Sequence, residues 1–414
     1  MGPEMLAYPF LFISIFFESF VLVTLLSKPA RVARARVKAP EHALPEVSII
    51  VPCYNEAATV LGTCESLLAL DYPKQKLSIV LVDDGSTDET PSAMARFASH
   101  PQITIIHKKN GGKHTALNAG IAASKAEIIG CLDADSFVEP DALKEIIACF
   151  EKPEAAAATA AMSVHKPTNM LQYMQHMEYI FGIALRHSLA SVNGLYVTPG
   201  PFSLYRRSVV LALGGFRDGH QTEDLEMALR IQKAGYHIEN APRARVYTKA
   251  PSTVAKLVKQ RTRWTTGFLR NVFNEYRGLV GNRRYGALGT FVLPIGLLSI
   301  MSGILLFGIA LFTLVNRVFT AYQTRAGIPL SYVFQWPSAT LDWFFLPLST
   351  YLLLALTTIS AGITLIIIGK RISNTPGSLL RGIISYIFLY GLVAPFWLMR
   401  ATADVALSRK RSWR

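Results

Sequence analysis

The sequence predicts an α/β domain with a mostly parallel sheet, joined to an α-helical membrane region. Short apolar, β-branched runs alternate with helical stretches from Val47 to about Tyr247, the pattern of βαβ units. Long apolar segments flank this region on both sides, and the 414-residue chain is 51% hydrophobic but only 17% charged. This length leaves room for a globular domain and a membrane-embedded part.

The charge balance points to an anionic partner. A net charge of +14 fits nucleic acid, an anionic membrane surface or an anionic substrate. The basic residues cluster beside apolar segments and the sequence contains no nucleic-acid module, which favours membrane lipids and a phosphate-bearing substrate. The four cysteines have no CxxC or zinc-like spacing, so we interpret them as reduced, buried cytosolic thiols.

Residues 1–27 are predicted to form a membrane anchor. Met5 to Leu26 is apolar apart from Glu18 and is long enough to cross a bilayer. The basic linker that follows, residues 28–46, should lie in the cytoplasm, which places the N-terminus outside. A cleaved signal peptide is the alternative, but no Lys or Arg precedes the apolar run and no small-residue cleavage site follows it.

Residues 47–250 are predicted to form the α/β domain, on the cytoplasmic side of the membrane. Its first half should contain four strands and four helices. The strands are Val47 to Val51, Leu77 to Val82, Ile103 to His107 and Glu127 to Leu132. The helices are Ala57 to Leu70, Thr87 to Ala98, His114 to Ser124 and Asp141 to Phe150.

Residues 251–284 show apolar positions at helical spacing, interleaved with Lys and Arg. This pattern indicates basic amphipathic helices on the inner membrane surface, with an ordinary surface helix as the alternative. Residues 285–414 contain three further apolar segments, at Gly286 to Val315, Leu341 to Ile368 and Gly382 to Leu398. A multi-pass protein with about four crossings is expected.

Four crossings create one conflict, because they place the basic end Ser408 to Arg411 outside the cell, against the charge bias. Either the last segment does not cross, or another crossing or re-entrant piece lies near Ile328 to Ser338.

Polar side chains follow the predicted strands where each strand ends. Asp133 and Asp135 follow the fourth strand, and two Asp residues at this spacing can share one Mg²⁺ or Mn²⁺ ion that neutralises phosphate charge. A solvated turn is the alternative. Asp83 and Asp84 end the second strand and could accept hydrogen bonds from a base or a ribose. A Gly-containing turn is the alternative there.

The first strand ends in a segment that suits the floor of a polar pocket. Pro52 belongs to this segment, and we expect Asn55 and Glu56 to cap the following helix. The loop ending at Lys113 fails the Walker pattern, and no GxGxxG follows a strand, so nucleotide hydrolysis and dinucleotide redox chemistry are disfavoured. We interpret it as a flexible loop whose Lys113 reaches a nucleotide.

Two later segments could carry the reaction. Thr222, Glu223 and Asp224 precede a helix, and a buried carboxylate there could deprotonate a hydroxyl. Simple N-capping by Thr222 is the alternative. Gln260, Arg263 and Trp264 share one helix face, where a guanidinium can bind a diphosphate and an indole can stack on a sugar. Interface anchoring is the alternative for Trp264.

Taken together, these motifs resemble the processive branch of glycosyltransferase family two, which includes cellulose, chitin-oligosaccharide, hyaluronan and poly-N-acetylglucosamine synthases. The resemblance covers roughly Val47 to Arg277. It implies a GT-A fold that binds a UDP-sugar, with UDP-N-acetylglucosamine as the best guess, and a polysaccharide or lipid acceptor. Accessory subunits are possible partners.

The resemblance also implies a role for each matching residue. Asp135 would ligate Mg²⁺ or Mn²⁺, Asp224 beside Glu223 would be the catalytic base, and Arg263 would stabilise the leaving UDP. The acceptor would meet Trp264, Thr222 and a looser match at Gly200 and Phe202. The donor and its nucleotide would contact Pro52, Asn55, Glu56, Asp83, Asp84, Lys113, Asp133, Gln260 and Arg263.

Two other functions stay open from the sequence. One is a non-processive transferase that glycosylates a membrane lipid once. The other is a catalytically silent sugar-binding or scaffolding membrane protein, which the intact carboxylates disfavour.

Overall fold

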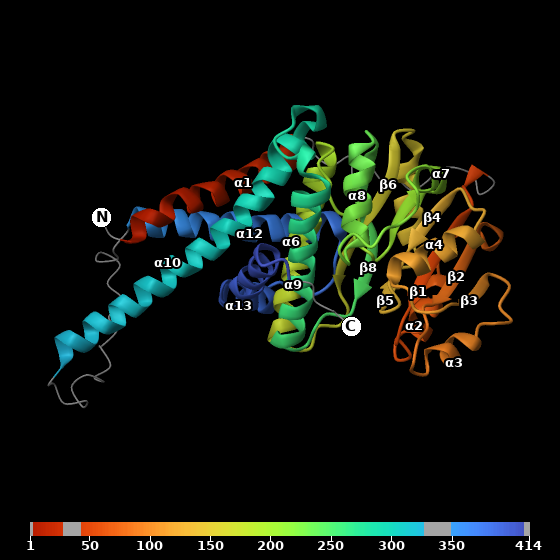
Figure 1. Ribbon diagram of the computed structural model, residues 1–414, viewed down its shortest axis with the longest axis horizontal. Helices are drawn as coiled ribbons and strands as arrows, with labels where there is room; N and C mark the ends of the chain where they lie inside the picture. The colour runs from red at the N-terminus through yellow and green to blue at the C-terminus, as the bar shows by residue number, and fades with distance from the viewer. Residues whose placement is uncertain (1–2, 28–42, 327–348, 410–414) are drawn as a thin grey trace.

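The computed structural model describes residues 3–27, 43–326 and 349–409. The basic linker at 28–42 and the possible extra crossing near 328–338 lie outside the described residues. The chain forms an α/β domain from which several long helices extend (Figure 1).

An eight-stranded mixed sheet forms the centre of the domain, in the order β3-β2-β1-β4-β7-β6-β8-β5. Four of its strand pairs are parallel, and β7 and β5 supply the three antiparallel pairs. The strands are β1 (Val47–Cys53), β2 (Leu77–Asp83), β3 (Ile103–His107), β4 (Ile128–Cys131), β5 (Ser136–Val138), β6 (Ala155–Val164), β7 (Ser203–Arg206) and β8 (His237–Thr248). The predicted mostly parallel α/β sheet is thus confirmed.

Helices cover both faces of this sheet. The helices of the domain are α2 (Val60–Leu68), α3 (Thr90–Ala95), α4 (Lys113–Ala123), α5 (Ala142–Ile147), α6 (Met170–Ser191), α7 (Arg207–Ala212), α8 (Glu223–Lys233) and α9 (Val254–Arg270). The four predicted strands agree with β1 to β4 within two residues. The first predicted helix starts too early: α2 begins at Val60 with Thr59 as its N-cap, so the expectation that Asn55 and Glu56 cap it is wrong.

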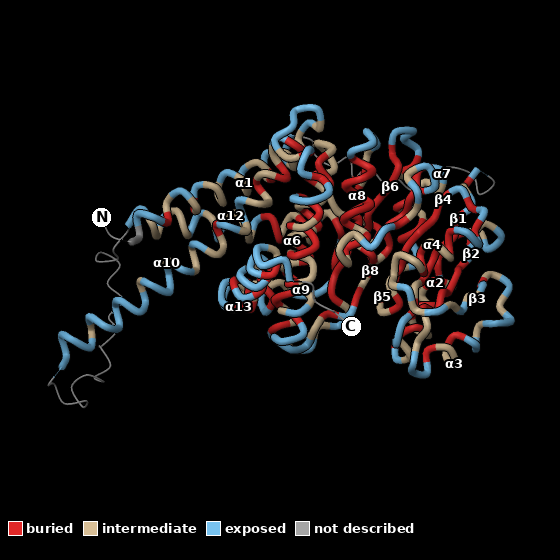
Figure 2. The backbone as a smooth tube through the Cα atoms, in the orientation of Figure 1, coloured by how far each residue is buried: buried red, intermediate tan, exposed pale blue. Residues whose placement is uncertain are grey.

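The core lies on both faces of the sheet, as Figure 2 shows by its buried strands. Successive side chains of a strand point to opposite faces, so Ile49 joins the core beneath α2 and α5, while Ile50 joins the core beneath α4 and α8. A sheet covered on both sides needs strands that are apolar almost throughout, and β1 has this composition.

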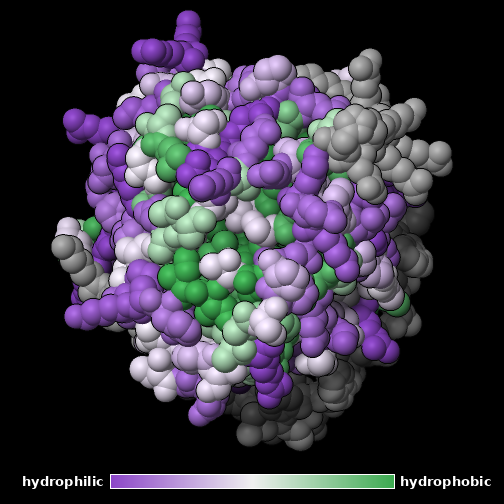
Figure 3. All heavy atoms as spheres, turned by 90° about the vertical axis from the view of Figure 1, so that its right-hand side faces the viewer, coloured by the Kyte–Doolittle hydropathy of each residue, from purple (hydrophilic) through white to green (hydrophobic). Residues whose placement is uncertain are grey.

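Four helices are long and apolar enough to cross a membrane, which makes the chain compatible with membrane insertion. Among them α1 (Tyr8–Ser27), α10 (Leu293–Arg325) and α12 (Thr350–Ser373) extend away from the domain, whereas α13 (Leu380–Ala406) stays beside α6 and α9 (Figure 1). Short helical turns of 3-10 or π type connect α9 to α10. The opposite end of the molecule is mainly hydrophilic around a central apolar area (Figure 3).

Candidate active site

The carboxyl ends of β1, β2 and β4 meet at one edge of the sheet because these three strands are parallel. Strand β7 runs the opposite way and therefore begins at this edge, which brings in the preceding Gly200. The same edge receives the N-terminal ends of α4 and α8, where Lys113 and Glu223 meet. Most of the predicted site residues therefore converge here.

Asp83 and Asp84 organise the loops where β2 ends at this edge. Asp83 accepts a hydrogen bond from the Ser86 backbone N–H at 2.9 Å and lies 3.1 Å from His107 Nδ1. Asp84 accepts hydrogen bonds from Lys108 Nζ at 2.6 Å and from the Gly111 and Gly112 N–H groups. Asp84 therefore fixes the loop that leads into α4, a role that the sequence did not predict.

Asn55 ties the first loop to the second. It adopts a left-handed backbone conformation, with φ at 56°, and its Oδ1 accepts a hydrogen bond from the Thr87 N–H at 2.8 Å. Neighbouring Glu56 accepts a hydrogen bond from the Thr59 hydroxyl at 2.7 Å. Burial raises the pKa of Glu56, and so does the nearby charge of Asp133. The pocket floor is therefore acidic as well as polar.

Lys113 lies at the centre of the site. Its ammonium is 2.6 Å from Asp133 Oδ1 and 2.9 Å from Glu223 Oε1. Burial opposes the charge, but these carboxylates hold the pKa of Lys113 well above its ordinary value. The same ammonium lowers the pKa of Glu223 in spite of burial. A single cation thus joins the β4 end of the sheet to the start of α8.

Gly200 leaves the space that this ion pair occupies. A Cβ atom at position 200 would lie 2.6 Å from Lys113 Nζ and 2.8 Å from Asp133 Oδ2, closer than real Cβ contacts. The predicted acceptor-side loop therefore touches the donor side of the site directly.

Asp135 is the residue best suited to a divalent cation. Its Oδ1 accepts hydrogen bonds from the Ser136 hydroxyl at 3.0 Å and the Thr248 hydroxyl at 3.3 Å. Burial, together with the charges of Asp133 and Glu56, raises the pKa of Asp135 to about 6. A cation would relieve this crowding of carboxylates.

The described residues contain no group of three or more His, Cys, Asp or Glu side chains that could hold a metal ion. Mg²⁺ in particular is commonly held by one or two carboxylates together with substrate phosphates. The donor set at Asp135 fits an ion of this kind, bound together with a nucleotide.

Asp224 lies in the first turn of α8. Burial, followed by the neighbouring charge of Glu223, raises the pKa of Asp224 to about 6. Its carbonyl oxygen accepts a hydrogen bond from the Thr198 hydroxyl at 2.8 Å, so the loop before β7 holds this turn in place. Burial therefore raises the basicity of Asp224 although the start of a helix favours the charged carboxylate.

Thr222 holds the start of α8 against α9. Its hydroxyl donates to the Gly219 carbonyl at 2.7 Å and lies 3.2 Å from Asn271 Nδ2. Gly267 packs directly on the Thr222 side chain, where any larger residue would collide with it. Thr222 is only 4% exposed and its side chain aligns α8 with α9, while its contact with an acceptor stays a prediction.

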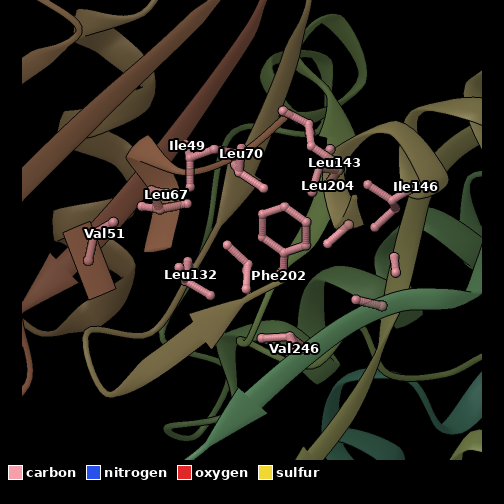
Figure 4. Packing of buried hydrophobic residues seen from close by; sticks show 14 of the residues in the cluster. Ile49, Val51, Leu67, Leu70, Leu132, Leu143, Ile146, Phe202, Leu204 and Val246 are labelled. Carbon is pink, nitrogen blue, oxygen red and sulfur yellow. The ribbon is translucent and has the colours of Figure 1, made fainter. Parts of the chain in front are cut away.

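Phe202 is a correction on the acceptor side. Its side chain is 0% exposed and lies in the apolar core, near Leu70, Leu143 and Leu204 (Figure 4). Its φ of 58° sends the chain from the site loop into β7. A buried core side chain has no surface for an acceptor.

The face of α9 that carries Gln260, Arg263 and Trp264 is partly exposed. Gln260 Oε1 is buried and has no hydrogen-bond partner among the described residues. Arg263 lies near enough to Glu223 to lower its pKa. The sequence did not single out Arg261, which is buried, pairs with Glu178 at 2.8 Å and lies over the Trp264 ring.

Other residues of the site also escaped the sequence analysis, namely Lys108, Thr198, Gly267 and Asn271. Their contacts join segments far apart in the chain, so a single sequence carries no local signal for them. Arg263, Gly267 and Asn271 do recur at four-residue spacing, which would have indicated one helical face.

The fold and this site define a glycosyltransferase with a GT-A fold. Acidic residues at the carboxyl ends of parallel strands, a buried carboxylate at a helix start and a basic helix lie together at one edge of the sheet. Residues 45–267 match the family described as glycosyltransferase-like family 2, and the chain belongs to this family.

The chain is similar to poly-beta-1,6-N-acetyl-D-glucosamine synthases. It is 31% identical to the one from Staphylococcus epidermidis over 234 residues, which are 56% of each chain. It is 28% identical to the one from Staphylococcus aureus (strain COL) over 245 residues, 58% of this chain and 59% of the relative. The chain thus spans somewhat more than half the length of the curated relatives that it matches.

Among solved structures, the chain resembles the mannosyltransferase PcManGT from Pyrobaculum calidifontis, determined in complex with GDP-Man and Mn²⁺. The TM-score is 0.57 at 19% identity, covering 97% of this chain and all of the other. At this identity the likeness shows the GT-A fold alone.

Proposed function

We propose that this protein is a membrane-embedded, inverting glycosyltransferase that transfers a sugar from a UDP-sugar to the hydroxyl end of a growing β-linked polysaccharide. The relatives named as poly-beta-1,6-N-acetyl-D-glucosamine synthases favour UDP-N-acetylglucosamine as the donor. The observation that carries the proposal is the meeting of Asp133, Lys113 and Glu223 beside Asp224 at one sheet edge.

The donor side of the reaction would use the sheet edge and α9. Asp83 and Asn55 lie where a nucleoside would bind, and Lys113, Gln260 and Arg263 offer cationic or amide groups to a diphosphate. Asp135 would hold Mg²⁺ or Mn²⁺ beside that diphosphate. Bound there, the ion would neutralise the charge that develops on the leaving UDP.

The acceptor side would use Asp224 and Trp264. The acceptor hydroxyl oxygen attacks the anomeric carbon while the bond from that carbon to the UDP oxygen breaks, and the electron pair leaves with UDP. Asp224 takes the hydroxyl proton, and its raised pKa suits a base that works near neutral pH. A single displacement of this kind inverts the anomeric configuration.

Membrane insertion supports a product that leaves through the bilayer. The apolar helices α1, α10 and α12, with α13 packed on α6 and α9, would give a polysaccharide a route from catalysis to export. On this proposal the catalytic domain is cytoplasmic, where nucleotide sugars are made.

Purified protein with UDP-N-acetylglucosamine or UDP-glucose and Mn²⁺ tests the proposal, by UDP release and mass analysis of the product. Asp224→Asn and Asp135→Asn should each lower UDP release at least a hundredfold. Glu127→Gln is the matched control, since Glu127 directly precedes β4, at the end far from Asp133, and is 63% exposed.

Parental rates in both site variants would contradict the assigned roles. A ladder of oligomers supports polymerisation, whereas a single glycolipid would show the non-processive lipid transferase instead. Binding of UDP without turnover of any donor would favour a silent sugar-binding protein.

A further inference from the structure

The C-terminal helix α13 has the length and composition of a membrane-crossing helix, but it packs unlike the other three candidates. Its most apolar stretch is 33% buried inside the protein, against 11% for α1, 11% for α10 and 17% for α12. In Figure 1, α1, α10 and α12 extend away from the domain while α13 lies against α6 and α9.

The first half of α13 packs on α6. A Cβ atom at Gly382 would lie 2.6 Å from Met177 Cε, and Ile383 and Tyr386 surround the cluster of Met177 and Ile180. Helix α6 is in turn fixed to the catalytic domain, because Gln175 Nε2 donates to the Pro251 carbonyl at 2.8 Å.

The second half of α13 packs on α6 and α9 together. Trp397 and Val393 share an apolar cluster with Leu171 of α6 and Leu257 of α9. Beyond them, the Arg270 guanidinium at the end of α9 donates to the carbonyl oxygens of Asp404 and Arg409. Both ends of α13 therefore lie on helices that are docked to the catalytic domain.

The position of α9 argues against a membrane-crossing orientation of α13, which packs on it. Gly267, one turn before Arg270, packs on Thr222 beside the catalytic carboxylates, so this end of α9 cannot be on the far side of a bilayer. The same helix carries Lys256, Lys259 and Arg263, and such charges are too costly for the hydrocarbon core. A crossing α13 would have to carry its last turn about 30 Å from its first, across the hydrocarbon core.

The exposed face of α13 is mainly apolar between Ile384 and Met399, with Arg381 and Arg400 exposed near its two ends. Its exposed large hydrophobic residues recur every three or four positions and so form one face: Leu380, Ile384, Ile387, Phe388, Leu392 and Phe396. A lipid-facing apolar side is common to crossing and interfacial helices, and it is the attachment of α13 along its length to α6 and α9 that favours an orientation in the plane of the interface.

We propose that α13 lies in the plane of the membrane interface, its exposed apolar face in the lipid, and that the C-terminal end stays on the side of the catalytic domain. Of the four candidate helices among the described residues, α1, α10 and α12 then cross the membrane. Arg409 at the end of the described residues then lies on the cytoplasmic side, in agreement with the charge bias that four crossings violate.

Labelling of single added cysteines with a membrane-impermeant maleimide tests the side on which each end lies. In intact host cells, Ser408→Cys should be protected to the same extent as Ser378→Cys, which lies between α12 and α13. Thr324→Cys, near the end of α10, should be labelled. The parent chain with its four native cysteines sets the background, and disrupted membranes should expose both protected sites. Labelling of Ser408→Cys in intact cells at the level of Thr324→Cys would overturn the proposal.

Spin labels on the exposed face distinguish the orientations independently of sidedness. With Ile384→Cys, Leu392→Cys and Phe396→Cys in vesicles, relaxation by oxygen against a nickel chelate should report the same shallow depth at all three positions. A label at position 392 that lies much deeper in the bilayer than the label at position 384 would show a crossing helix. Low accessibility to both reagents would show a protein partner, such as a second copy, and would also overturn the proposal. Neither measurement uses enzyme activity, so the outcome is separate from that of the proposed function.

Discussion

The Arg261 guanidinium carbon lies 4.2 Å from the centre of the Trp264 ring, so a buried cation covers one face of the indole expected to meet the acceptor. The same guanidinium pairs with Glu178 of α6 at 2.8 Å and lies 5.4 Å from the Tyr179 ring. Because α6 and α9 are linked through this group, the orientation of the Trp264 ring depends on a buried ion pair between the two helices.

Arg261→Met should therefore weaken acceptor use more than catalysis. A cation over an aromatic ring contributes about 0.5–2 kcal/mol, so we expect the KM for an oligosaccharide acceptor to rise about twofold to thirtyfold. Loss of the ion pair adds a penalty at Glu178, which Glu178→Gln would test on its own. Initial rates at varied acceptor concentration measure the effect.

Lys259→Met is the matched control for this prediction, because Lys259 is exposed on the same helix. Its kinetic constants should stay within about twofold of the parent. A change in kcat for Arg261→Met at constant KM would contradict a positioning role.

Gly200→Ala should abolish most donor binding. The added methyl group would have to displace the Lys113 ammonium or the Asp133 carboxylate, since it would lie 2.6 Å from one and 2.8 Å from the other. We expect the affinity for UDP to fall at least tenfold, measured by calorimetric titration. Gly278→Ala is the control, because nothing lies within 4 Å of a Cβ at that position, and unchanged UDP binding by Gly200→Ala would sink the idea.

The sequence was most informative for candidate site residues that directly follow the ends of parallel strands. Asp83, Asp133 and Asp135 were found because β1 to β4 are apolar runs with clear ends, and the structure brings them to one edge. The antiparallel strand β7 and the long pair β6 and β8 were not predicted, since Ala-rich β6 lacks the β-branched pattern of a strand.

The sequence was least informative for residues whose role depends on which way a side chain points. Thr222 and Phe202 stand in segments assigned to the acceptor, yet one side chain aligns two helices and the other fills the core. Whether a side chain points into a cleft or a core is set by long-range packing, for which short motifs carry no signal.

The pH dependence of the reaction should report the carboxyl groups of α8 and β4. Since the pKa of Asp224 is raised to about 6, the rate should fall as the pH drops below about 6, where the base becomes protonated. Asp135, with its pKa also raised to about 6, titrates in the same range in the absence of a cation. Saturating Mn²⁺ should remove the contribution of Asp135, so the rate should fall less steeply with falling pH than it does without the ion. A rate independent of pH between 5 and 8 would contradict the assignment of the base.

The raised pKa of Asp224 also affects the stability of the protein. A carboxyl whose pKa is 3.8 when unfolded and about 6 when folded binds more protons in the folded state between these values. Its contribution to the free energy of unfolding therefore falls as the pH rises from about 4 to 6. Above pH 6 the ionised carboxylate destabilises the folded state. Asp224→Asn should raise stability at pH 8 by roughly 1–2 kcal/mol and have little effect near pH 4, as measured by thermal unfolding in detergent. A loss of stability at pH 8 would mean that the carboxylate is better stabilised than its burial indicates.

Lys113→Met should remove the ion pairs that join the end of β4 to the start of α8. Its ammonium is shared between Asp133 and Glu223, so its removal leaves two carboxylates facing each other without a cation. Repulsion between them should cost roughly 1–2 kcal/mol of stability, because the lysine is 32% exposed and partly screened. UDP affinity should fall about tenfold or more, since a charge-assisted contact to the nucleotide is also lost. Lys109→Met, exposed in the same loop, is the control.

In the double variant Lys113→Met with Glu223→Gln, part of the lost stability should return, because one of the two facing charges is gone. If the two substitutions were additive in thermal unfolding, the ammonium would not couple β4 to α8.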